Sequence, residues 1–189
     1  MDGKNLLKKY SSSNFKNALV KSGVTDGDCL FIHSNIGFFG IPDNCNNKDE
    51  ACNLILNAIL SVIGKKGTVV VPTYTYSFSS NEDFLYNQKS VCGMFSEFVR
   101  KNDQSERTID PIFSVSALGY QAKSLTTNIS NNSFDDNSFF SRFHSINGKI
   151  CNFNLNAGST FIHYIERLLN VNYRYDKEFS GKIIFNTKK

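Results

Sequence analysis

The chain has 189 residues, 40% of them hydrophobic and 20% charged, and this balance suits one compact domain over residues 1–189 with a substantial core. The formal net charge of +4 suits a small polyanionic ligand, but no Lys/Arg block interleaves with aromatic residues, so nucleic acid is not an expected partner. The N-terminus has no hydrophobic signal region, no apolar run approaches membrane-spanning length, and the five cysteines are scattered without a C-x-x-C motif. Together these features predict a cytoplasmic protein without a membrane partner.

The first half of the chain predicts a strand–helix–strand unit. Residues 11–23 indicate a short amphipathic helix that stops at a glycine. Residues 29–32 form a continuous apolar run, which is typical of a strand buried on both faces, and residues 68–71 form another. Between them, apolar residues recur on one wide face over residues 48–63, which predicts a helix. A helix between two buried strands favours a parallel α/β unit.

Polar and aromatic residues follow both of these strands. The first strand ends at His33-Ser34-Asn35, and the second leads into Pro72-Thr73-Tyr74-Thr75-Tyr76. In open α/β sheets, ligands bind beyond the carboxyl ends of the strands. The two strand ends therefore predict one shared cleft.

The second half of the chain continues the alternation of helices and strands. Its patterns predict a helix over residues 93–100, a strand over 115–119, a loop over 126–136 and a strand over 149–155. A breaker pair then leads into a helix over residues 160–170, with Ser159 and Thr160 as N-cap residues. A last strand is predicted over residues 182–185.

The helix over residues 160–170 carries the side chains best suited to catalysis. Thr160, His163 and Glu166 are spaced three apart, so they share one face of the helix. A carboxylate one turn away can hold an imidazole, which is the minimum equipment of a general base. Two other interpretations stay open at this point. The pair also fits a solvated helix face, or two ligands of a metal site, although metal sites need three or more ligands.

Six groups of residues along essentially the whole chain carry a resemblance. They are Gly27-Asp28 with His33-Ser34; Gly67-Thr68 with Pro72-Thr73-Tyr74-Thr75; Gly93 with Glu97 and Arg100; Arg107 with Pro111 and Ser114; Thr160 with His163 and Glu166; and Tyr173-Arg174-Tyr175 with Lys177, Phe179 and Gly181. Each group alone is a weak signal, whereas all of them in this order are specific. The chain thereby resembles the aminoglycoside 3-N-acetyltransferases, also called the antibiotic N-acetyltransferases.

The resemblance implies an α/β fold, a three-layer α/β/α sandwich with a mostly parallel or mixed central sheet. It implies an acyltransferase that uses acetyl-CoA, and no metal, to acetylate the amine of an amino sugar by direct transfer. The acceptor would be an aminoglycoside or a cell-surface or nucleotide-linked amino sugar. The oligomeric state is not indicated. Members of the family are longer than this chain, so we expect a single acetyltransferase domain that lacks the family's C-terminal part.

The family's pattern also assigns roles to single residues. It makes His163 the general base and Glu166 its partner. Coenzyme contacts are expected from His33, Ser34, Asn35, Arg107, Phe113 and Ser114. Acceptor contacts are expected from Tyr74, Glu97, Asp110 and Thr160. A backbone N–H or the hydroxyl of Ser34 or Thr73 would stabilise the oxyanion of the tetrahedral intermediate.

Several alternatives accompany these assignments. Asp110 stands where the drug-inactivating members usually have a histidine, which favours an acceptor other than a drug. Ser34 and Ser114 also fit as turn residues at strand ends, and Arg107 as a surface cation. A rival function is a catalytically degenerate coenzyme- or sugar-binding protein of the same fold. A rival mechanism is ping-pong acyl transfer through Cys92, just ahead of a helix start that could lower its pKa.

Overall fold

The structure is a computed structural model that describes residues 9–156 and 158–185. Its centre is a five-stranded sheet in the order β4-β5-β2-β1-β6. The strands are β1 (Cys29–Ser34), β2 (Thr68–Pro72), β4 (Glu106–Arg107), β5 (Val115–Gly119) and β6 (Lys149–Phe153). Strands β2, β1 and β6 are parallel, whereas β5 is antiparallel to both β2 and β4. A short loop joins β4 to β5. Such a loop is sufficient because the two strands are antiparallel, whereas parallel strands need a longer crossover connection.

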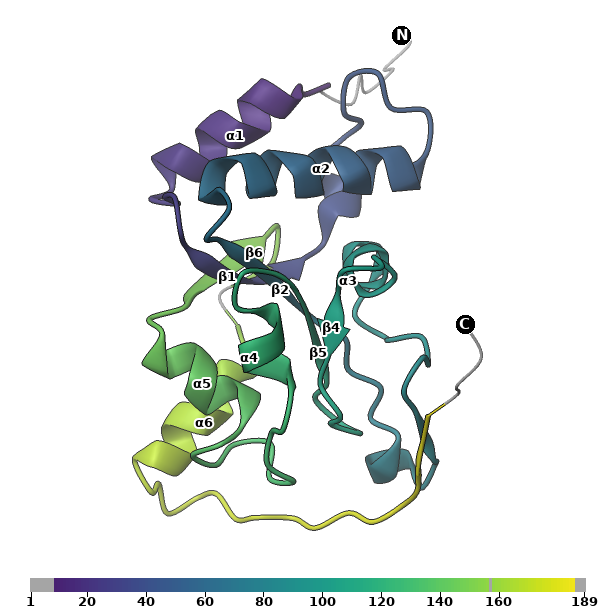
Figure 1. Cartoon of the computed structure of the whole chain (residues 1–189), viewed down its shortest axis with the longest axis vertical. Helices are drawn as coiled ribbons and strands as arrows, with labels where there is room; N and C mark the ends of the chain where they lie inside the picture. The colour runs from purple at the N-terminus through teal and green to yellow at the C-terminus, as the bar shows by residue number, and fades with distance from the viewer. Residues whose placement is uncertain (1–8, 157, 186–189) are drawn as a thin grey trace, which may run out of the picture.

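Helices cover both faces of this sheet (Figure 1). One layer contains α1 (Ser12–Lys21), α2 (Lys48–Ile63) and α3 (Met94–Arg100), and the other contains α4 (Ala122–Thr126), α5 (Phe139–Ser145) and α6 (Phe161–Leu168). Successive side chains of a strand point to opposite faces. Leu30 and Ile32 therefore pack under the first layer, while Phe31 packs under the second. The predicted three-layer sandwich with a mixed sheet is confirmed.

Helix α2 has the bounds that its apolar period predicts, Lys48–Ile63. The Asn47 side chain accepts the N–H groups of Asp49 and Glu50, which satisfies two of the free donors at the helix start. Its buried face presses on β1 and β2. Gly64 ends the helix with φ of 65°, a left-handed conformation that glycine adopts without steric cost.

Other elements differ from the prediction or were not predicted. The strand predicted over residues 149–155 ends at Phe153, and the helix predicted over 160–170 covers 161–168. Helices α4 and α5 were not predicted, nor were the short 3-10 helices η1 (Ile36–Phe38) and η2 (Phe78–Ser80). The last strand, β7 (Ile183–Ile184), does not join the central sheet. It pairs with β3 (Phe84–Leu85) in a separate two-stranded sheet.

The segment between α6 and β7 crosses the molecule. In Figure 1 it is the yellow trace that leaves the end of α6 and runs along the lower edge to the opposite side. Its pairing with β3 and an ion pair between Arg167 of α6 and Asp176 hold it in place. We call residues 170–182 the crossing segment below.

Candidate active site

The segments that carry the predicted site residues meet at one edge of the sheet. Because β2, β1 and β6 are parallel, their carboxyl ends lie at the same edge, and α6 follows β6 there. Strand β5 is antiparallel, so its first residues come to this edge as well. A hydrogen bond of 2.8 Å between His33 Nε2 and Ser159 Oγ joins the end of β1 to the start of α6. The sheet topology thus brings the predicted strand ends together.

His163 and Glu166 form a hydrogen-bonded pair on α6. Nδ1 of His163 lies 2.9 Å from Oε2 of Glu166, and the side chains are 33% and 14% exposed. The His163 ring also stands edge-on against Phe134, with 5.7 Å between ring centroids. The hydrogen-bonding contacts with His163 and Arg174 lower the pKa of Glu166 below its usual value. With Nδ1 turned to the carboxylate, Nε2 is the nitrogen left for proton transfer.

Two residues of the crossing segment complete this pair. Arg174 places Nε 2.6 Å from Oε2 of Glu166 and Nη2 2.7 Å from Nδ1 of His163. The Tyr173 hydroxyl donates to Oε1 of Glu166 over 3.4 Å. The sequence marked Tyr173-Arg174-Tyr175 only as part of the family pattern and did not indicate this contact. The sequence signal for this contact was a cationic residue, Arg174, a few positions after the end of the helix that carries His163.

Aromatic side chains form a wall beside His163. Starting from Tyr74, the rings of Phe113, Phe134 and His163 follow one another at centroid distances of 5.4, 5.3 and 5.7 Å. Burial raises the pKa of Tyr74, and the nearby Thr160 side chain opposes this rise. The predicted coenzyme residue Phe113 therefore connects to His163 through Phe134, and the predicted acceptor residue Tyr74, beside Thr160, lies at the far end of the same row. Phe134 was not predicted.

His33, Ser34 and Asn35 lie where β1 ends, beside the start of α6. Burial lowers the pKa of His33 to about 4, so its ring is neutral near pH 7. The Asn35 N–H donates to the Phe153 carbonyl over 2.8 Å. A pocket of about 280 Å³ begins one residue further along the chain. It lies between η1, the following loop and the start of α2, and its lining includes Ile36, Gly37 and Lys48.

Arg107 uses its guanidinium inside the protein. It donates to the carbonyls of Thr73, Tyr86 and Gln88 over 2.6 to 2.8 Å and to the Ser114 hydroxyl over 3.1 Å. The side chain is buried, which lowers its pKa to about 10, and it lies over the Phe84 ring. Ser114 in turn donates to the Thr73 carbonyl over 2.6 Å. Arg107 and Ser114 thus hold the loop after β2 against β5.

Glu97 and Asp110 are likewise bound to protein groups. Glu97 accepts from Arg100 and from the Ser90 N–H. Although burial alone would raise the pKa of Glu97, these bonds lower it to about 2. Asp110 accepts the N–H groups of Ile112 and Phe113 at 2.8 Å, and its other oxygen accepts the Ser133 hydroxyl. Among the predicted site residues, Phe113 alone is hydrogen-bonded to one of these carboxylates, through its backbone N–H to Asp110.

The other chemistries proposed for this chain have little support. Burial raises the pKa of the Cys92 thiol to about 11, whereas a nucleophilic thiolate needs a lowered value. Across residues 9–156 and 158–185, no three His, Cys, Asp or Glu side chains gather closely enough to hold a metal ion. In the same part of the chain, no helix has both the length and the apolar character needed to cross a membrane.

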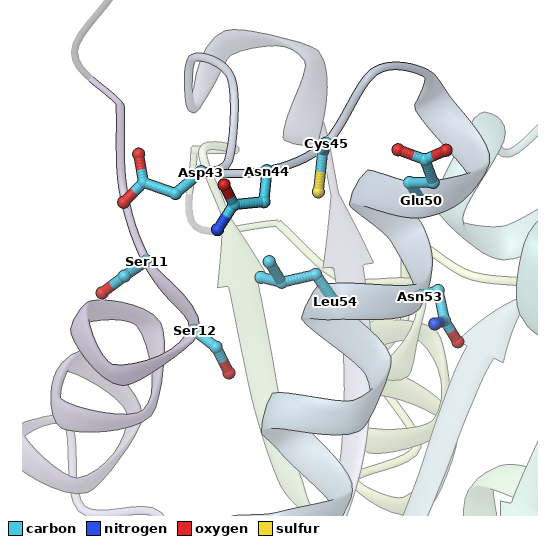
Figure 2. Close-up of a pocket in the computed structure, with 8 residues that line it drawn as sticks. All are labelled: Ser11, Ser12, Asp43, Asn44, Cys45, Glu50, Asn53 and Leu54. Atoms are coloured by element: carbon cyan, nitrogen blue, oxygen red, sulfur yellow. The ribbon is translucent and has the colours of Figure 1, made fainter.

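Figure 2 shows a polar pocket of about 390 Å³ that lies elsewhere, between the starts of α1 and α2. Ser11 there caps α1, and Glu50 accepts the Asn46 N–H over 2.6 Å, so these groups serve the helix starts. We therefore do not include the pocket in the candidate site. Its lining residues are Ser11, Ser12, Asp43, Asn44, Cys45, Glu50, Asn53 and Leu54.

A family model identifies the family of the chain, and solved structures share its fold. A family model described as aminoglycoside 3-N-acetyltransferase matches residues 32–189. The solved structure of the aminoglycoside acetyltransferase AAC(3)-IVa superposes with a TM-score of 0.76 at 20% identity, over 88% of this chain and 64% of that one. AAC-IIIb with CoASH gives 0.72 at 19% identity, over 85% and 66%. Sisomicin-bound AAC-VIa gives 0.71 at 20%, over 84% and 65%.

These likenesses to solved structures concern the fold, and the chain spans slightly less than two thirds of each of those structures. No curated protein sequence matches the chain.

Proposed function

Since the chain belongs to the aminoglycoside 3-N-acetyltransferase family, we propose that it is an acyltransferase that moves an acetyl group from acetyl-CoA to the amine of an amino sugar. The observation that carries this proposal is the His163–Glu166 pair, which lies at the sheet edge where the strand ends meet. Two of the similar structures support the substrates, because AAC-IIIb is bound to CoASH and AAC-VIa to sisomicin. We further propose that residues 1–189 act as one acetyltransferase domain in the cytoplasm.

In the proposed reaction, His163 acts as the general base. The amine nitrogen attacks the thioester carbonyl carbon, and its proton passes to Nε2 of His163. The carbon–sulfur bond then breaks, the proton on Nε2 passes to the sulfur, and the coenzyme leaves as a thiol. When Nδ1 carries a proton, Glu166 accepts its hydrogen bond, which orients the ring and stabilises the imidazolium. A base in this position contributes roughly 10²–10⁴-fold to the rate.

The coenzyme is proposed to reach the pair along the end of β1. The pocket that begins after Asn35 supports this placement, because Lys48 at its rim supplies positive charge for a phosphate. Ser34 is the better candidate for an oxyanion donor, since the Thr73 hydroxyl lies near the Ser114 and Ser116 hydroxyls at 3.4 Å. A direct coenzyme contact from Arg107 or Ser114 remains a prediction, and their internal hydrogen bonds favour a supporting role.

The acceptor is proposed to lie against Tyr74 and Thr160. The charge of Glu97 is paired with the Arg100 guanidinium, and both oxygens of Asp110 accept hydrogen bonds from protein groups, so neither carboxylate is directed at an ammonium group of a drug. We therefore expect faster turnover of a monoamino sugar, such as a nucleotide-linked one, than of a gentamicin-like aminoglycoside. Expression in a sensitive bacterium should leave aminoglycoside susceptibility nearly unchanged. A large rise in resistance that requires His163 would contradict this preference.

The activity itself is tested by measuring free thiol release from acetyl-CoA with a panel of amino sugars and aminoglycosides. Turnover with at least one acceptor, lost in His163→Ala, is the expected result. Calorimetric binding of CoA, measured in parallel, separates the rival function. Binding of CoA and of an amino sugar without any turnover would show a catalytically degenerate binding protein instead.

A further inference from the structure

Nδ1 of His163 has two neighbours with opposite requirements. Oε2 of Glu166, 2.9 Å away, can only accept a hydrogen bond when the carboxylate is ionised. Nη2 of Arg174, 2.7 Å away, can only donate one. In a neutral imidazole, Nδ1 carries either a proton or a lone pair. It therefore satisfies one of these two neighbours at a time.

The two tautomers of the neutral His163 ring differ in their ability to act as a base. With the proton on Nδ1, the ring donates to Glu166, and the lone pair on Nε2 can take the proton of an amine. With the proton on Nε2, the ring accepts from Arg174, and Nε2 has no lone pair to offer. Glu166 therefore favours the tautomer that can act as a base, and Arg174 favours the other one.

The crossing segment holds Arg174 at this position without burying it. The Tyr173 hydroxyl bonds to Glu166, and Asp176 pairs with Arg167 of α6, so the residues on both sides of Arg174 are attached to the helix. The Arg174 side chain itself is 46% exposed. It can consequently leave Nδ1 while keeping its second contact, from Nε to Glu166, with little cost in buried area.

We propose that Arg174 is a positioning residue that sets the tautomer of His163, holding the ring in the form that cannot act as a base until its guanidinium leaves Nδ1. The proposal rests on the proposed role of His163 as the base. Within the described residues, the charged groups that face the ring are Glu166 and Arg174. Tyr173 reaches the ring only through Glu166, and the loop packed against it contributes the uncharged Phe134.

The direct test is nitrogen-15 NMR of the histidine side chains, with His163 assigned by comparison with His163→Ala. We expect the lone-pair nitrogen of His163 to be Nδ1 in the wild type and Nε2 in Arg174→Met. Arg174→Lys, which keeps a donor and a charge, should retain the wild-type pattern. The matched control is Lys177→Met, which removes a cation of the same segment that lies over the Phe179 ring and should leave the tautomer of His163 unchanged. The same tautomer in the wild type and in Arg174→Met would overturn the proposal.

Rate measurements add a second readout. In Arg174→Met, kcat/KM on the alkaline plateau should rise about two- to tenfold, the factor expected from one hydrogen bond of ordinary net strength. A merely structural Arg174 predicts lower activity in Arg174→Met, which would refute the proposal. If no variant shows any turnover, the proposed function fails, while the tautomer measurement still decides the role of Arg174.

Discussion

Replacement of Arg107 by methionine separates a structural role from a coenzyme role. Arg107 is 6% exposed, and its guanidinium donates to three backbone carbonyls at 2.6 to 2.8 Å. Methionine keeps much of the buried stem but removes every donor. Each buried carbonyl left without a partner lowers the free energy of unfolding by about 1–3 kcal/mol. Removing the buried charge offsets part of this loss, because that charge no longer has to be desolvated. We expect a net destabilisation of about 3–5 kcal/mol, a range typical of breaking a buried charged network.

The assay is urea unfolding followed by circular dichroism, together with thermal unfolding. For a chain of this size, 3–5 kcal/mol corresponds to a fall in Tm of roughly 6–20 °C. Arg167→Met is the control, because this partly exposed pair with Asp176 should contribute less than about 1 kcal/mol. Wild-type stability in Arg107→Met, accompanied by at least tenfold weaker acetyl-CoA binding, would refute the structural reasoning and establish the coenzyme contact.

Three further predictions concern the histidines and the thiol. His163→Ala should lower kcat by roughly 10²–10⁴-fold while CoA binding survives, and Glu166→Gln should cost less, since it only orients the ring; equal rates in His163→Ala and wild type would exclude the base. The folded-state pKa of His33 is lowered to about 4 from 6.5, so its contribution to stability is present above pH 6.5 and is lost as pH falls through about 4. In His33→Gln, the free energy of unfolding measured with urea should therefore depend less on pH in that window. A pH dependence equal to that of the wild type would contradict the burial argument. Incubation with acetyl-CoA alone should leave no acetyl adduct on Cys92 in mass spectra, because its thiol stays protonated; a stable adduct lost in Cys92→Ala would overturn direct transfer.

The elements that local pattern controls could be predicted well. Helix α2 has its predicted bounds because its apolar period and its Asn47 and Gly64 ends are all local signals. The parallel pairing of β1 with β2 follows from the helix between them. The contact of His163 with Glu166 was predictable for the same reason, since residues three apart on a helix are always neighbours.

By itself, then, the amino-acid sequence determined the buried strands, the parallel α/β unit and the one pair that sits on a single helix, whereas the three-layer arrangement was implied by the family resemblance. The tertiary structure decided the contacts between residues that are distant along the chain or that lie outside regular elements. His33 meets Ser159 across 126 positions, and Arg174 reaches His163 only because the crossing segment turns back along α6. The family pattern predicts a coenzyme contact for Arg107, but the direction in which its guanidinium points depends on the carbonyls that surround it after folding. The spacing of residues along the sequence predicts which side chains share a face of one helix or strand. The hydrogen-bond partners of a charged group or of a lone pair come from other segments, and these become neighbours only in the packed fold.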